Sequence, residues 1–135
     1  MSTKTLGRPL KKRLLKVLPP TARLERAVAA GEVVAALRLF GIKQRMIALS
    51  TGATERSVRN WKRTSAIASK YEDGLRKLQE IVLILTETLT PRGVGQWLSA
   101  PNRVLKLRRP IEVLAEGTAA AVRKAALANV EGTYV

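Results

Sequence analysis

A run of regularly spaced apolar residues between positions 75 and 89 constrains the fold of this 135-residue chain more than any other feature. The run alternates steps of three and four residues, and it comprises Leu75, Leu78, Val82, Leu85 and Leu89. That spacing places all of its members on one continuous stripe of an α-helix. Three further apolar residues widen the stripe: Ile81, Leu83 and Ile84. The pattern predicts a long helix over 71–89 that is buried on most sides, either in the domain core or across a dimer interface.

The rest of the chain after residue 20 is also predicted to be helical. Ala, Leu, Arg and Glu dominate it, and the alternation typical of strands is missing. Breaks are expected at Gly31, Gly41 and Gly117, Pro91 and Pro110 should open helices, and Thr118 should cap the last one. The expected helices are 21–30, 32–40, 44–50, 54–63, 71–89, a helix opened by Pro91 that carries Trp97 and Leu98, 101–107, 111–116 and 119–131. The predicted fold class is therefore all-α.

Residues 44–63 have the layout of a helix-turn-helix. The two helices of this motif cross closely, and Ala48 is the small residue that the crossing needs. Gly52, four residues later, can adopt the positive φ of the turn. Val58 and Trp61, three residues apart, give the second helix its buried face.

The opposite face of that second helix is rich in Arg and Asn. On a helical wheel these side chains point away from Val58 and Trp61. Arg and Asn read guanine and adenine edges in the major groove, and arginines also contact phosphates. The expected base-contacting residues are Arg56, Arg59 and Asn60. The residues better suited to the DNA backbone are Thr54, Ser57, Lys62 and Arg63. The alternative is that these charges form only a solvated helix face.

The charge distribution separates two halves of the chain. The net charge is +15, from 25 Lys and Arg against 10 Asp and Glu. Residues 1–70 hold 16 basic and three acidic side chains, whereas residues 71–135 hold nine and seven. This asymmetry predicts that the N-terminal half binds a polyanion, with operator DNA favoured over an anionic membrane. We expect a basic arm over 1–20, a helix-turn-helix domain over 21–70 and a helical partner-binding or dimerisation domain over 71–135.

The basic arm has two interpretations. A disordered, solvated tail is the default for such a composition. The alternative is that its leucines dock on the rest of the protein: Leu10, Leu14, Leu15 and Leu18.

Several classes of function are disfavoured by what the sequence lacks. The chain contains no Cys and no His, which removes the commonest zinc ligands and the commonest general base. We therefore expect no enzyme activity, no metal and no cofactor. The longest purely apolar run, Ile81 to Leu85, is far shorter than a membrane span. With no recognisable secretory signal, the expected location is cytoplasmic and away from membranes.

The C-terminal half carries a series of linked motifs. They are, in order, Gly95-Gln96-Trp97-Leu98, then Ser99-Ala100-Pro101-Asn102-Arg103-Val104-Leu105, then Arg108-Arg109-Pro110-Ile111-Glu112-Val113-Leu114, and finally Gly117. In this order they resemble the Xre/MbcA/ParS antitoxin family of RES–Xre toxin–antitoxin systems. With the Xre-like helix-turn-helix included, the resemblance covers residues 30–135 and leaves out the basic arm.

The resemblance implies a partner. It is a RES-domain toxin that resembles ADP-ribosyltransferases and consumes NAD, and the antitoxin is thought to block the NAD pocket with its C-terminal end. Here Gly132 would break the last helix, Tyr134 would act as an amphipathic anchor, and the carboxylate of Val135 would meet cations. The residues expected to bind the toxin are Arg123, Lys124, Gly132, Thr133, Tyr134 and Val135. The alternative for the last residues is a frayed terminus.

The expected function is therefore that of a type II antitoxin that inhibits its cognate RES-domain toxin and represses its own operon, as a homodimer on a palindromic operator. The alternative is a stand-alone helix-turn-helix repressor whose C-terminal half dimerises. An enzyme or a membrane-surface protein fits least well. Within the motifs, core positions are expected at Trp97, Leu98, Leu105, Leu114 and Val122. Asn102, Arg103 and Arg109 could either cap helices or face the toxin.

Overall fold

The structure of this protein is a computed structural model that describes residues 8–62 and 67–132. Within those ranges it is all-helical, as predicted, apart from one isolated β-bridge between Asn102 and Arg108. The elements are α1 (Arg8–Val17), α2 (Pro20–Arg26), α3 (Ala30–Arg38), α4 (Gln44–Thr51), α5 (Glu55–Asn60), α6 (Ser69–Leu85), α7 (Pro91–Ser99), the 3₁₀ turn η2 (Arg103–Leu105), α8 (Pro110–Ala115) and α9 (Ala119–Glu131).

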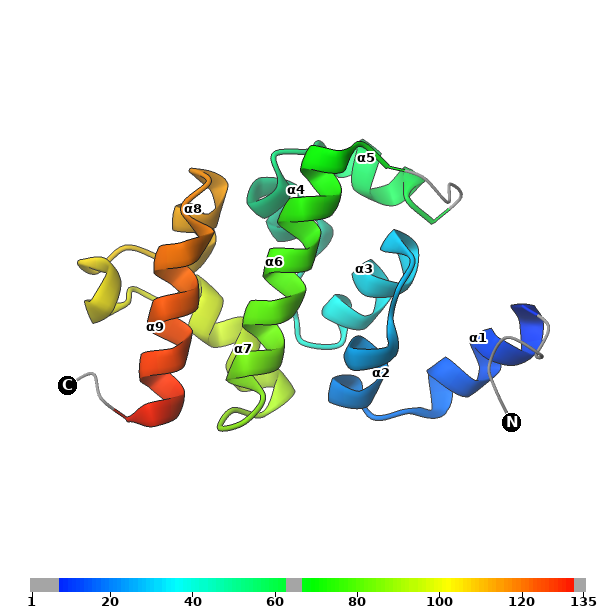
Figure 1. The fold of residues 1–135 in the computed structure, drawn as a ribbon, viewed down its shortest axis with the longest axis horizontal. Helices are drawn as coiled ribbons and strands as arrows, with labels where there is room; N and C mark the ends of the chain where they lie inside the picture. Colours follow the sequence, from blue (N-terminus) through cyan, green and yellow to red (C-terminus); the bar gives the residue numbers. More distant parts are fainter. Residues whose placement is uncertain (1–7, 63–66, 133–135) are drawn as a thin grey trace.

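The long helix α6 lies at the centre of the fold (Figure 1). It packs against α2, α3 and α4 on one side and against α9 on the other. Its stripe residues Leu75, Leu78, Val82 and Leu85 are buried, and only Leu89, beyond the end of the helix, is half-buried. Of the two locations predicted for this helix, the domain core is the one observed.

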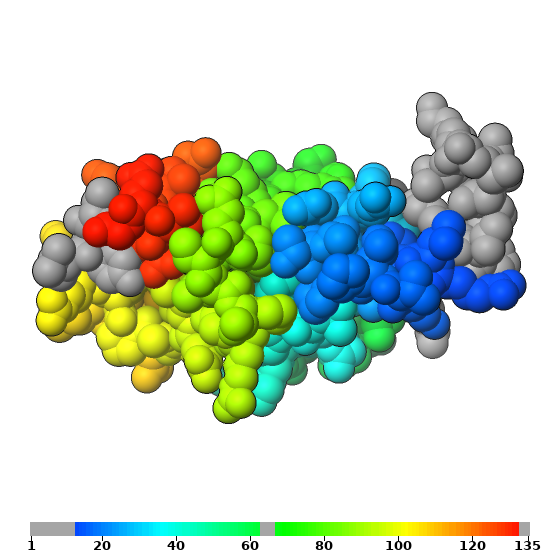
Figure 2. All heavy atoms as spheres, turned by 90° about the horizontal axis from the view of Figure 1, so that it is seen from below, coloured from blue at the N-terminus to red at the C-terminus, as the bar shows by residue number. Residues whose placement is uncertain are grey.

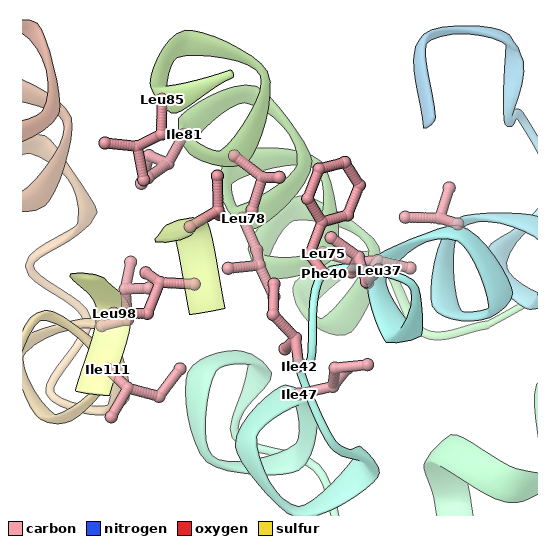
Figure 3. Packing of buried hydrophobic residues seen from close by; sticks show 14 of the residues in the cluster. Leu37, Phe40, Ile42, Ile47, Leu75, Leu78, Ile81, Leu85, Leu98 and Ile111 are labelled. Carbon is pink, nitrogen blue, oxygen red and sulfur yellow. The ribbon is translucent and has the colours of Figure 1, made fainter. Parts of the chain in front are cut away.

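The core is continuous from the N-terminal helices to the C-terminal ones. Figure 3 shows Phe40 and Ile42 from the end of α3 and the segment after it meeting Leu78 of α6. Leu98 of α7 and Ile111 of α8 extend the same cluster. Because each fully buried aliphatic side chain contributes about 1.5–3 kcal/mol, this shared cluster is the main source of stability for both halves.

Two glycines allow helices to approach one another closely. A Cβ atom built on Gly95 of α7 would lie 2.3 Å from the carbonyl oxygen of Phe40. One built on Gly74 of α6 would lie 3.1 Å from the Cα atom of Thr51. At both positions the backbone of a neighbouring segment occupies the space that a larger side chain would need.

The break predicted at Gly31 is wrong. Gly31 lies in the first turn of α3, and the chain leaves helical conformation at 27–29 instead. A Cβ on Gly31 would lie 3.1 Å from both the carbonyl oxygen of Trp61 and the Cα atom of Lys62, so its small size serves packing. The start of α3 is fixed by the Glu32 carboxylate, which accepts a hydrogen bond of 3.1 Å from the backbone N–H of Ala29.

Other predicted details also differ from the structure. Residues 101–107 contain only the short turn η2, because two consecutive left-handed residues, Lys106 and Leu107, interrupt the chain there. Thr118 occupies the position before α9, but its side chain makes no capping hydrogen bond. Helix α5 ends at Asn60, before the predicted end at residue 63. In contrast, Pro91 and Pro110 open α7 and α8 as expected.

The described part of the basic arm contains a helix. Within α1, Leu15 is buried and Leu14 is exposed, and Leu18 just after it is half-buried. Docking of this arm through at least one leucine is therefore confirmed, whereas the side chain of Leu10 lies outside the described part.

Among the predicted core positions of the C-terminal half, Trp97 is half-buried and the other four are buried: Leu98, Leu105, Leu114 and Val122. No helix in the described ranges is long and apolar enough to cross a membrane.

Candidate functional site

Helices α4 and α5 pack against one another across a tight turn. Gly52 ends α4 with a φ of 79°, and its N–H donates a hydrogen bond of 3.0 Å to the carbonyl of Ala48. Thr54 then caps α5, because its Oγ1 accepts a hydrogen bond of 3.1 Å from the N–H of Ser57. Val58 and Trp61 face inward and are buried, so the inward and outward faces of α5 are those predicted from the sequence.

The outward face of α5 carries exposed polar and basic side chains. Arg56, Arg59, Asn60 and Lys62 are all exposed, and Arg63 lies outside the described residues. Within the described part of the chain, no ion pair involves α5, so its arginines are not neutralised by neighbouring carboxylates. Ser57 is half-buried and accepts a hydrogen bond from the Thr54 hydroxyl, so this pair is engaged within the helix cap. Free guanidinium groups on a rigid helix suit the recognition of base edges or phosphates.

A second group of cations, which the sequence pattern alone does not reveal, lies beside the start of α4. Arg38, Lys43 and Arg45 line a shallow depression that Glu55 of α5 also borders. The first turn of α4 has no side-chain cap, so its backbone N–H groups also contribute positive potential there. The high net charge of the N-terminal half favours such groups of cations, but the grouping of these three beside Glu55 of α5 arises only in the fold.

The other end of the molecule is formed by α9 and its surroundings. Helix α9 ends at Gly132, which has a φ of 66°, as the sequence predicts. The residues that follow, Thr133, Tyr134 and Val135, lie outside the described part. Of the two cations proposed on α9, Lys124 is exposed, whereas the Nε of Arg123 lies 2.6 Å from the Oε1 of Glu80 on α6. Arg123 therefore ties α9 to α6, and Lys124 is the more available of the two.

The motif residues Asn102 and Arg109 have structural contacts. Asn102 is buried, and its Oδ1 accepts a hydrogen bond of 2.9 Å from the N–H of Val104. Arg109 pairs with Glu112 one turn along α8, at 3.5 Å. Arg103 is exposed. No group of three or more carboxylates that could hold a metal ion occurs in the described ranges.

Comparison with known proteins identifies the family. The chain is 46% identical over 112 residues to "Probable mycobacterial cidal antitoxin Rv3188" of Mycobacterium tuberculosis, a match that covers 83% of this chain and 96% of the relative. The chain belongs to this antitoxin family. The antitoxin part of the resemblance seen in the sequence motifs is thereby confirmed. No family model matches the chain.

A solved structure supports the same assignment. The fold matches a chain of the M. tuberculosis MbcT–MbcA toxin–antitoxin complex with a TM-score of 0.68 and 25% sequence identity. The match covers 81% of this antitoxin and 99% of the matched chain. The helical arrangement is therefore shared over almost the whole of that chain.

Proposed function

We propose that this antitoxin binds a cognate RES-domain toxin, occludes its NAD-consuming active site with its C-terminal end, and represses its own operon by binding DNA through α5. The observation that carries the proposal is the 46% identity to a cidal antitoxin across nearly the full length of that relative. A match of this extent includes both the basic N-terminal half and the nearly neutral C-terminal half.

The DNA-binding part of the proposal rests on the exposed face of α5. Arg56, Arg59 and Asn60 would contact base edges, and Thr54, Ser57, Lys62 and Arg63 would contact the backbone. Arg38, Lys43 and Arg45, beside the start of α4, add a second set of groups suited to phosphates. Because one such unit binds DNA weakly, a homodimer on a palindromic operator is the expected arrangement.

The toxin-binding part rests on the end of α9. Gly132 ends the helix in a left-handed conformation, and three residues of sequence follow it. Among them, Tyr134 offers one aromatic anchor, which is suited to an NAD pocket built to hold an aromatic base. Lys124 would contact the toxin surface, and Arg123 could do so while still bound to Glu80.

Co-expression with the product of the neighbouring open reading frame tests the function. If the proposal holds, the two proteins co-purify, and cellular NAD falls when the neighbour is expressed alone but not when the antitoxin is present. An absence of co-purification, combined with specific DNA binding by the antitoxin alone, would instead favour the stand-alone repressor.

A further inference from the structure

The loop that joins α7 to α8 is built as a closed, rigid turn. The N–H of Asn102 donates a hydrogen bond of 3.0 Å to the carbonyl of Arg108, and the N–H of Leu107 donates one of 2.8 Å to the carbonyl of Asn102. Leu105 is buried beneath the loop, and Arg108 is held by an ion pair of 2.6 Å with Glu116. These contacts fix the conformation of the residues at the loop tip.

The tip combines backbone strain with exposed apolar surface. Lys106 and Leu107 both have positive φ, 57° and 68°, a conformation that Gly or Asn adopts far more easily. The side chain of Leu107 is nevertheless 68% exposed, and that of Val104 is 37% exposed. Because most of the Leu107 side chain is exposed in a strained backbone conformation, it gains little from the fold of its own chain and is suited to a contact outside it.

The position of the loop indicates which partner it meets. Its turn η2 packs against α9, and Figures 1 and 2 show the loop beside that helix, on the side of the molecule away from α2 and α3. The exposed cations Arg103 and Lys106 flank the apolar tip. The loop therefore presents a small apolar knob with a basic rim beside α9, the helix whose exposed Lys124 is proposed to contact the toxin.

We infer that the tip of this loop, formed by Val104, Lys106 and Leu107, is a second toxin contact beside the one proposed for α9. The inference rests on the proposed function, since the partner is the toxin. Leu107 would insert into the toxin surface and supply most of the binding affinity of this contact, whereas the C-terminal residues would inhibit the toxin.

The test separates toxin affinity from folding. Leu107→Asn removes the apolar side chain but tolerates positive φ, so the variant should melt at the same temperature as the wild type or higher. Its affinity for the purified toxin encoded beside the antitoxin gene should nevertheless fall about tenfold or more, as measured by biolayer interferometry. The matched control is Leu39→Asn, which alters another exposed leucine, 43% exposed, at the end of α3. Its toxin affinity should stay within about twofold of the wild type.

Three outcomes would overturn the inference. One is an unchanged toxin affinity for Leu107→Asn. Another is a weaker affinity that comes with a lower melting temperature, because the loss would then be structural. The third is a self-association of the antitoxin alone that Leu107→Asn abolishes in sedimentation velocity, which would assign the tip to a second copy of this chain. If wild-type antitoxin fails to bind the toxin at all, the proposed function itself is wrong.

Discussion

The buried side-chain amide of Gln79 on α6 donates a hydrogen bond of 2.8 Å to the backbone carbonyl of Leu24 in α2. The same amide donates one of 3.2 Å to the carbonyl of Ala27, and its oxygen accepts one of 3.0 Å from Arg76. The side chain of Gln79 thus holds the C-terminal end of α2 against the central helix α6. It is one of four buried polar residues in the described part of the chain.

Substitution of Gln79 should therefore destabilise the protein. Gln79→Leu leaves the carbonyl of Ala27 without this partner and should lower the free energy of unfolding by about 1–3 kcal/mol. Gln79→Glu keeps the oxygen that accepts from Arg76 but replaces the amide donor with an oxygen that faces two carbonyl oxygens, so it should also destabilise the protein. Urea denaturation measures both. The matched control is Gln96→Leu on the exposed face of α7, which should change stability by less than about 0.5 kcal/mol. Equal effects at the two glutamines would show that the bond to Leu24 contributes nothing.

Gly95→Ala should destabilise the protein even though alanine is the better helix former. The gain in helix propensity is about 1 kcal/mol. The steric cost is larger, because the new Cβ atom would lie 2.3 Å from the carbonyl oxygen of Phe40 and would force α7 away from that backbone. We expect a net loss of about 1–3 kcal/mol, seen as a lower thermal midpoint. Gly93→Ala in the same helix is the control, because its nearest neighbour is a side-chain oxygen, that of Thr90, at 3.2 Å. A Gly95→Ala protein as stable as the Gly93→Ala protein would contradict the prediction.

Arg59→Ala should weaken operator binding by about 1–3 kcal/mol and relax the preference at one base pair, because the guanidinium group is exposed and unpaired on the outward face of α5. Gel-shift titrations at several salt concentrations measure both effects. Arg92→Ala on α7 removes another exposed cation, away from that face, and should leave affinity nearly unchanged. If both variants bind alike, Arg59 does not read the operator.

Deletion of Thr133–Val135 should release toxin activity without affecting DNA binding. The deletion leaves α9 and its core residues Val122, Ala125 and Ala126 intact, so folding should be preserved. The measurement is NAD consumption by the toxin at saturating antitoxin, with a gel shift as the folding control. A truncated antitoxin that still silences the toxin would place inhibition elsewhere on the surface.

Features governed by local sequence were predictable. The stripe of α6, the Gly52 turn, the Thr54 cap and the Gly132 terminus each depend on residues within one or two helical turns of each other. The outward face of α5 followed from the same local geometry. The antitoxin family followed from linked motifs in a fixed order.

Features that depend on distant segments were not predictable. The local sequence predicts a helix break at Gly31, because no nearby residue shows that Trp61 and Lys62 pack against it. The hydrogen bonds of the buried Gln79 side chain could not be predicted, because the carbonyl groups that accept them are more than 50 residues away in the sequence. The sequence predicts a helix where the strained loop at Lys106 and Leu107 lies. Its composition does not reveal that the backbone N–H and carbonyl of Asn102 both form hydrogen bonds across the loop. The cations beside the start of α4 were missed because their grouping arises only in the fold.

The central position of α6 also determines when this chain can complete its fold during synthesis. The ribosome delivers α2 to α5 first, but their apolar surfaces stay uncovered until residues 69–85 have emerged, and α6 in turn packs against α9. We therefore expect the N-terminal helices to reach their final packing only after α9 has been translated. Likewise, a protease that removes α9 should destabilise the N-terminal helices together with the C-terminal ones, because a single core joins them.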